Sequence, residues 1–137
     1  MPKVKGENIS IRLRRFGAQA VRLCQTFPKG PAAKHVVSQL VRAATGGGAN
    51  YEEARGAESR ADFIHKVGVA NKEMREALYW LQLVQDADLV VSADINTLVR
   101  EADELVAILT ASIKTAKQRE GTSCAEASSW LPDRALE

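Results

Sequence analysis

Hydrophobic residues recur at alternating spacings of three and four positions along four stretches of the chain, with polar residues between them. This is the period of an amphipathic helix, which buries one stripe of side chains and exposes the others. Only short segments separate the four stretches, so consecutive helices must turn back on one another. We therefore expect an all-α fold, an antiparallel up-down-up-down four-helix bundle whose helices cross at about 20°.

The first helix is expected over residues 9–27. Its buried stripe would comprise Ile9, Leu13, Phe16, Ala20, Leu23 and Phe27. Ser10 is a candidate N-cap, because a serine hydroxyl can accept a hydrogen bond from a backbone N–H of the first turn. Pro28 and Gly30 would end the helix.

The second helix is expected to start at Pro31, which suits a first helical turn, and to end near Gly56. Its stripe would comprise Val37, Val41, Ala44, Gly48 and Tyr51, with Val36 and Leu40 alongside. The glycines at 46–48 are unusual there, because each costs a helix about 1 kcal/mol relative to alanine. Either the helix breaks at this run, or the missing side chains let another backbone approach closely. Neighbouring alanines and residues 52–55 favour a continuous helix.

The third helix has an expected N-cap at Ser59, with Asp62 in the acidic position of a capping box. Its stripe is the most regular in the chain: Phe63, Val67, Ala70, Met74, Ala77, Leu81 and Val84. Leu78 and Trp80 widen its apolar surface, which suggests contact with another subunit. After a turn at 86–92, the stripe of the fourth helix would be Ile95, Leu98, Ala102, Leu105, Leu109 and Ala116.

The hydrophobic period stops after residue 119, where small and polar residues take over. We expect residues 1–119 to form the bundle. Residues 120–137, here called the C-terminal tail, are expected to be disordered or held by Trp130 and Leu131. A chain of 137 residues is long enough to bury the core of one domain.

Composition agrees with a helical fold and argues against several classes of protein. Aromatic residues make up only 5% of the chain, whereas a sheet core relies on aromatic and β-branched residues. Cys24 and Cys124 are isolated thiols, and no apolar signal segment is seen, so we expect a reduced, cytoplasmic protein. No apolar run approaches the roughly 20 residues that cross a membrane.

Candidate catalytic and metal-binding residues are few. A di-iron bundle needs two Glu-x-x-His motifs, but Asp62 and His65 form the one carboxylate–histidine pair at that spacing. Cys24 lies beside the apolar Leu23. It is expected to pack rather than to react, because a reactive thiol needs a polarised site. The glycines at 46–48 lack the Gly-Lys-Ser/Thr of a phosphate loop. We predict no metal, no cofactor and no enzymatic activity.

Charge is unevenly distributed along the chain. The net charge is +2, but the first 30 residues hold seven lysines and arginines against Glu7 alone. The C-terminal tail instead holds four acidic residues against Arg134. This asymmetry is consistent with a surface that binds a polyanion, and equally with a solvated surface and a loose tail.

One side of the first helix concentrates the positive charge. The residues of this basic face, at spacings that place them together, are Arg12, Arg15, Gln19 and Arg22. Arginine forks suit phosphate oxygens, and clustered cations gain affinity by releasing counterions. We therefore predict RNA binding through the arginines of this face, extended by Arg14 and Lys34. The alternative is that these arginines are solvated or pair with acidic residues of a neighbouring helix.

A polar stretch marks the end of the second helix and its turn into the third. The residues of this corner are Asn50, Tyr51, Glu53, Arg55, Ser59, Arg60 and Phe63. Their polar groups would be able to form a hydrogen-bonded clasp. We favour a structural cap and intersubunit network here, and the alternative is a ligand site.

These residues carry a resemblance to the four-helix bundle proteins encoded within intervening sequences of bacterial 23S ribosomal RNA genes. The resemblance covers roughly residues 10–115. The matching runs are Gln39-Leu40-Val41-Arg42-Ala43-Ala44, residues 50–53, Ser59 with Phe63-Ile64, the third helix to Leu83, and Thr26-Phe27-Pro28. Many members place a helix-ending glycine directly after the glutamate, where this chain has Ala54, so the chain looks like a sub-branch.

The resemblance implies a bundle that assembles into a ring-shaped homopentamer. The related accessory protein of diversity-generating retroelements similarly forms pentamers, and binds a reverse transcriptase and nucleic acid through a basic surface. With the basic face, this implies a non-enzymatic oligomeric scaffold for ribosomal or other structured RNA, a ribonucleoprotein or a reverse transcriptase-like protein. The alternative is a protein-interaction module that docks a partner on exposed apolar surface such as Tyr79 and Trp80.

Overall fold

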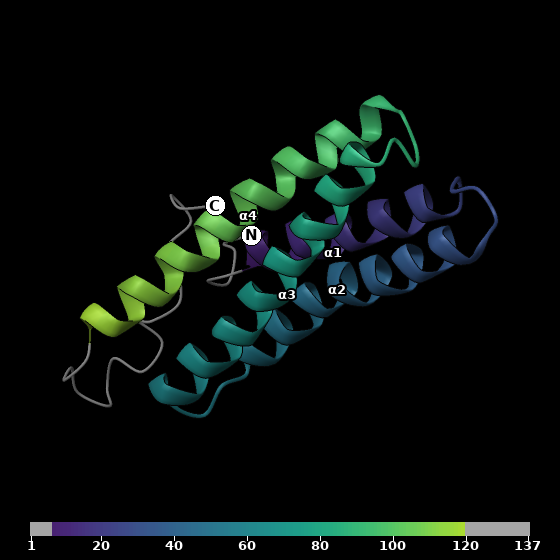
Figure 1. The fold of residues 1–137 in the computed structure, drawn as a ribbon. Helices are drawn as coiled ribbons and strands as arrows, with labels where there is room; N and C mark the ends of the chain where they lie inside the picture. Colours follow the sequence, from purple (N-terminus) through teal and green to yellow (C-terminus); the bar gives the residue numbers. More distant parts are fainter. Residues whose placement is uncertain (1–6, 120–137) are drawn as a thin grey trace.

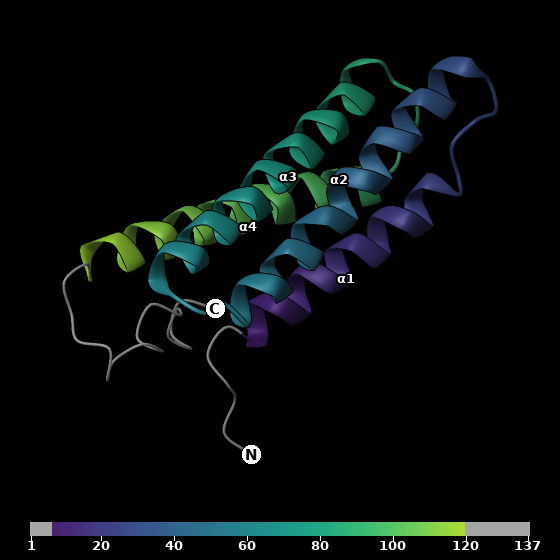
Figure 2. The same ribbon diagram turned by 90° about the horizontal axis from the view of Figure 1, so that it is seen from below.

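The computed structural model describes residues 7–119, which contain four helices. These are α1 (Glu7–Cys24), α2 (Pro31–Arg55), α3 (Arg60–Asp86) and α4 (Ala93–Gln118). Each helix packs antiparallel against the next, and α1 also contacts α4 (Figure 1, Figure 2). The predicted antiparallel four-helix bundle is confirmed. Residues 1–6 and the C-terminal tail lie outside the described residues, and so do the predictions made for them.

All four helices contribute to the core, including Ile9, Leu13, Phe16, Ala20 and Leu23 of the stripe predicted for α1. The predictions for α3 and α4 are the most complete. Every residue of both predicted stripes is buried. Ser112 of α4 is buried with them, although the hydrophobic pattern omits it because serine is polar. Of the four pairs of packed helices, α2 and α3 make the most extensive contact and α1 and α4 the sparsest. No helix within residues 7–119 has the length and apolar character needed to cross a membrane.

The predicted limits of α1 were wrong at both ends. The helix begins at Glu7, so Ser10 lies inside it and is not the N-cap. The Ser10 hydroxyl instead donates a hydrogen bond to the carboxylate of Glu52 on α2. At the other end, α1 stops at Cys24, because the following backbone closes into tighter turns, with N–H groups bonded three residues back at 2.9–3.2 Å. Phe27, predicted as the end of the stripe, is only half-buried.

Helix α2 is continuous through the glycine run, as predicted, but its buried stripe is displaced. The buried residues are Ala33, Val36, Leu40, Ala43, Ala44, Gly47, Tyr51 and Ala54. The predicted Val37, Val41 and Gly48 are half-buried. The reason is that many buried positions of α2 are alanine or glycine, which hardly mark a hydrophobic stripe. Gly47 faces Met74 of α3, for example, and Gly48 faces Leu13 of α1.

The glycine run lies where α3 approaches α2 closely. A Cβ on Gly47 would lie 2.5 Å from the sulfur of Met74, and one on Gly46 would lie 2.5 Å from a carboxylate oxygen of Glu73. On the other side of α2, a Cβ on Gly17 of α1 would lie 3.2 Å from the carbonyl oxygen of Ala44. The missing side chains therefore let both neighbouring helices pack against α2.

Serine caps begin the last two helices. The hydroxyl of Ser59, the predicted cap of α3, accepts a hydrogen bond from the backbone N–H of Asp62 at 3.0 Å. The carboxylate of Asp62 accepts from the backbone N–H of Glu58 at 3.4 Å, one residue earlier than in a standard capping box. Ser92 caps α4 in the same way through the N–H of Asp94. These caps fix where α3 and α4 begin.

Two glycine-to-alanine substitutions should act in opposite directions. Gly68→Ala in α3, where nothing lies within 4 Å of an added Cβ, should stabilise the fold by about 0.5–1 kcal/mol through helix propensity. Gly47→Ala gains the same propensity but must displace the buried Met74 side chain. Overpacking costs roughly 1–3 kcal/mol, so the free energy of unfolding should fall by about 1 kcal/mol overall. Urea denaturation of both variants would test this, and a stabilised Gly47→Ala would contradict the close packing.

Candidate functional site

The basic face of α1 is partly neutralised by α4. The guanidinium of Arg12 donates to both carboxylate oxygens of Glu101, at 2.6 and 3.2 Å, and forms an ion pair with Glu104 at 3.2 Å. The hydrogen bond to Glu101 raises the pKa of Arg12 above its ordinary value, against an opposing effect of burial. Arg12 therefore pairs with acidic residues of a neighbouring helix, which was the alternative to RNA binding for this residue.

Arg15 and Arg22 are exposed, and within residues 7–119 neither forms an ion pair. Arg15 lines a surface hollow between α1 and α4 together with Arg100 of α4. Arg22 lines the next hollow along the same side, with Gln19 and Thr97. The α1–α4 side of the bundle thus carries a row of available cations beside the Arg12 ion pair.

Arg100 extends this row, although it was not predicted to belong to the basic face. It lies on α4, so its place beside the basic face depends on how α4 packs against α1. The sequence contains no local signal for that packing. The charge of the row is offset by Glu101 and Glu104, which line the same hollow.

Arg14 lies on a different side of α1, toward α2. It lines a groove there with Ser10, Glu52 and Arg55. The hydrogen bond from Ser10 lowers the pKa of Glu52, and attraction to Arg55 and Arg14 lowers it further. Arg55 donates to Glu52 at 3.1 Å. Arg14 therefore belongs to a mixed-charge cluster, separate from the row of cations on the α1–α4 side.

Lys34 lies far from Arg14 along the bundle. It is in the first turn of α2, where it lines a shallow hollow with Phe27 and Pro28 of the preceding turn. The structure therefore brings Arg12, Arg15 and Arg22 to one side of the bundle, as predicted from their spacing. It does not bring Arg14 and Lys34 to that side.

The corner residues are distributed between the core and local contacts. Tyr51 and Phe63 are fully buried. The side-chain amide of Asn50 donates to the carbonyl oxygen of Gly46 on its own helix at 2.8 Å, Arg55 bonds to Glu52, and Ser59 caps α3. Glu53 is exposed, and Arg60 is half-buried at the first position of α3. These contacts are those of packing and capping.

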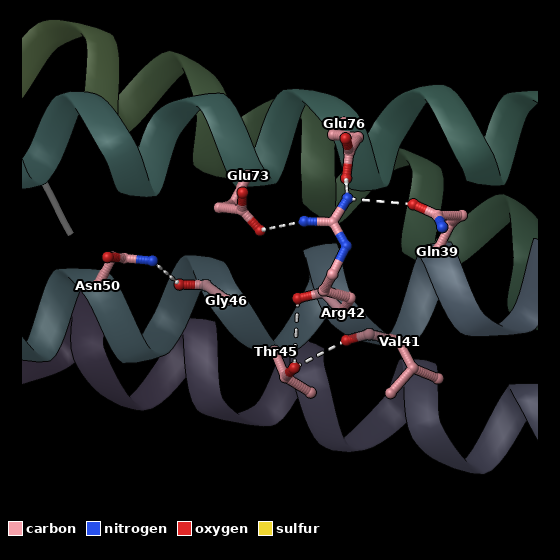
Figure 3. Close-up of polar contacts among 8 residues, drawn as sticks. All are labelled: Gln39, Val41, Arg42, Thr45, Gly46, Asn50, Glu73 and Glu76. Carbon is pink, nitrogen blue, oxygen red and sulfur yellow. Dashed lines mark hydrogen bonds and ion pairs between the residues drawn. The ribbon is translucent and has the colours of Figure 1, made fainter.

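A polar cluster joins α2 to α3 along the outside of the bundle (Figure 3). Arg42 of α2 bonds to Glu76 at 2.6 Å and approaches Glu73 at 3.8 Å, both on α3. It also donates to Gln39 of its own helix at 3.1 Å. Figure 3 shows these side chains beside Gly46, over which Glu73 lies. Glu73, whose charge is paired with Arg42, therefore covers Gly46.

An aromatic group lies on the α2–α3 side. Trp80 makes edge-to-face contacts with His35, at a ring-centroid distance of 5.8 Å, and with Tyr79, at 5.0 Å. Trp80 is half-buried, and its indole N–H has no hydrogen-bond partner among the described residues. Tyr79 is 55% exposed, which makes it one of the most exposed large apolar residues of the described chain.

Metal-binding and nucleophilic groups are scattered. Within residues 7–119, no three His, Cys, Asp or Glu side chains lie close enough to hold a metal ion. Cys24 is buried at the end of α1, and burial raises the pKa of its thiol to about 11. A thiol with this pKa is almost entirely protonated at neutral pH and is a poor nucleophile.

Comparisons with known proteins identify the family to which the chain belongs. The family model described as the 23S rRNA-intervening sequence protein matches residues 9–111. The chain belongs to this family. A crystal structure of a protein of unknown function from the S23 ribosomal protein family of Bacteroides thetaiotaomicron is similar, with a TM-score of 0.71 and 30% sequence identity. The alignment covers 78% of this chain and 99% of that one. A comparison with curated proteins finds no match.

Membership of the 23S rRNA-intervening sequence protein family confirms the resemblance that was inferred mainly from the motifs in α2 and α3. The family match ends at residue 111, inside α4, so it includes the basic face and both carboxylates that bind Arg12. A shared fold does not by itself assign a function, which must be argued from surface residues.

The Arg12–Glu101 pair should contribute measurably to stability. It is bidentate and half-buried, so a double-mutant cycle with Arg12→Ala and Glu101→Ala should give a coupling energy of about 1 kcal/mol at low salt. The coupling should shrink as salt screens the charges. Urea denaturation at two salt concentrations measures it, with the exposed Arg15→Ala as control. A coupling near zero at low salt would mean that the pair does not form in solution.

Proposed function

We propose that this member of the 23S rRNA-intervening sequence protein family is a non-enzymatic oligomeric scaffold that binds structured RNA, alone or within a ribonucleoprotein. The supporting observation is that Arg15 and Arg22 are exposed on one side of α1 and form no ion pair within residues 7–119. Arg100 adds a third cation on the adjoining helix. An available guanidinium can donate two parallel hydrogen bonds to a phosphate.

Arg12 has a different role in this proposal from the one predicted. Its fork is occupied by Glu101, and a phosphate would have to displace that carboxylate to bind it. Arg12 therefore holds α1 against α4, and the exposed arginines on either side make the contacts to RNA. Arg14 and Lys34, which lie on other sides of the bundle, would contact RNA only if it wraps around the protein.

Assembly matters to the proposal because the row of cations on one subunit is short. A net charge of +2 is modest for a protein that binds nucleic acid. In a homo-oligomer, which the family resemblance implies to be a pentamer, the same row recurs on every subunit. Several weak contacts then act together and raise the overall affinity without any new contact.

The proposal predicts that RNA binding depends on Arg15 and Arg22 and on salt. Replacing both by alanine should weaken binding to all structured RNAs alike, and should reduce the slope of log affinity against log salt by about 2 per engaged subunit. Fluorescence anisotropy of a labelled RNA hairpin at several salt concentrations measures both quantities.

The matched control is Lys72→Ala with Arg75→Ala, which removes two exposed cations from α3 instead. It should leave the affinity and the slope nearly unchanged. An equal loss of RNA affinity in both double variants would mean that binding depends on net charge and not on the positions of Arg15 and Arg22. Absence of binding by the wild type at low salt would overturn the proposal.

A second candidate function rests on the aromatic group. Exposed Tyr79, packed against Trp80, offers an apolar surface on the α2–α3 side, away from the row of cations. A protein partner that docks there would bury apolar area, and its affinity would change little with salt. Tyr79→Ala should abolish such binding and leave RNA binding intact, so the two functions can be tested separately.

A further inference from the structure

The outer side of the α1–α2 pair carries a groove of about 830 Å³. Its apolar lining includes Ile11, Ala18, Val21 and Ala49. Its floor is low because Gly17 and Gly48 have no side chains there. Val21 is 36% exposed, so this apolar surface is open to a ligand. We propose that the C-terminal tail of the same chain docks in this groove, with Trp130 and Leu131 on the apolar lining.

The charge of the groove suits an acidic segment. At one end, Arg14 and Arg55 line the groove together with Glu52, and both attract its carboxylate. Glu52 already accepts hydrogen bonds from Ser10 and Arg55, whereas Arg14 is exposed and forms no ion pair within residues 7–119. Arg14 is therefore available to bind a further carboxylate at the mouth of the groove.

The tail has the matching chemistry. It holds the adjacent pair Trp130 and Leu131, with Glu126 before this pair and Asp133 after it, and Leu136 is its other large apolar residue. An apolar pair flanked by carboxylates matches a groove whose apolar lining ends at an available arginine. A tryptophan side chain also buries a large area at small cost in conformational entropy.

The position where the tail starts also suits this groove. In an antiparallel bundle α4 ends where α1 begins and α2 ends, and Figure 2 shows these three helix ends toward the same end of the molecule. That end carries Ser10 and Arg55, the charged end of the groove. Residues 120–130 can span about 36–40 Å when extended. Two helix diameters are roughly 20–24 Å, so the tail is long enough to cross the bundle.

The fluorescence of Trp130 tests the proposal in the full chain. The protein has two tryptophans, so Trp80→Phe leaves Trp130 as the reporter. This substitution removes an indole N–H that has no partner among the described residues, so the fold should tolerate it. Trp130 should then show blue-shifted emission and protection from acrylamide, compared with a synthetic peptide of residues 120–137. The difference spectrum between wild type and Trp130→Phe provides the same information without altering Trp80.

Substitutions in the groove should release the tail. Val21→Asp and Arg14→Glu should each shift Trp130 emission to the red and restore quenching to that of the peptide. Lys72→Glu, which makes the same change of charge as Arg14→Glu on exposed α3 surface, should leave Trp130 protected. Peptide-like emission in the unsubstituted groove would overturn the proposal.

Two further outcomes would also overturn docking within one chain. Protection that disappears on dilution would mean that the tail comes from a neighbouring subunit. If Val21→Asp instead dissociates an oligomer, measured by sedimentation velocity, while Trp130 stays unaffected, the groove is an interface between copies of the chain. Neither outcome depends on RNA, so this test stands apart from the proposed function.

Discussion

The bundle depends on how closely two helices can approach α2. Gly46 and Gly47 replace side chains that would otherwise collide with Glu73 and Met74 of α3. Three glycines sacrifice helix propensity of roughly 3 kcal/mol, and tight packing across the most extensive helix contact in the bundle must offset this cost. Glu73, which is paired with Arg42, lies over Gly46 on the solvent side of this contact.

The charge on α1 is divided by packing into parts with different roles. Arg12 is used to hold α4, Arg14 takes part in a cluster with α2, and Arg15 and Arg22 remain exposed. A helical projection of the sequence separates Arg14 from Arg12, Arg15 and Arg22, but it does not show which of these side chains is neutralised. The neighbouring helices decide which of them can reach a ligand, because they supply the carboxylates that neutralise the others.

Much of the fold was predictable because α3 and α4 each bury a single regular stripe. The displaced stripe of α2 was not, because many of its buried positions are alanine or glycine, whose hydrophobic signal is weak. The Arg12–Glu101 pair was not predictable either, because it joins residues 89 positions apart in the sequence. The carboxylates at 101 and 104, three residues apart on one face of α4, were the available signal, but their use required knowing that α4 lies against α1. Arg100 was missed for the same reason.

The sparse α1–α4 contact has a consequence for motion. The other three helix pairs share more extensive contacts, whereas this pair is bridged at its surface by a guanidinium and two carboxylates. Charge attraction of this kind weakens with ionic strength, while apolar packing does not. Ion pairs therefore make up a larger share of the contact between α1 and α4 than of the contact between α2 and α3, which Arg42 also bridges. We expect local opening of the bundle to begin at this contact, at a lower free energy than global unfolding.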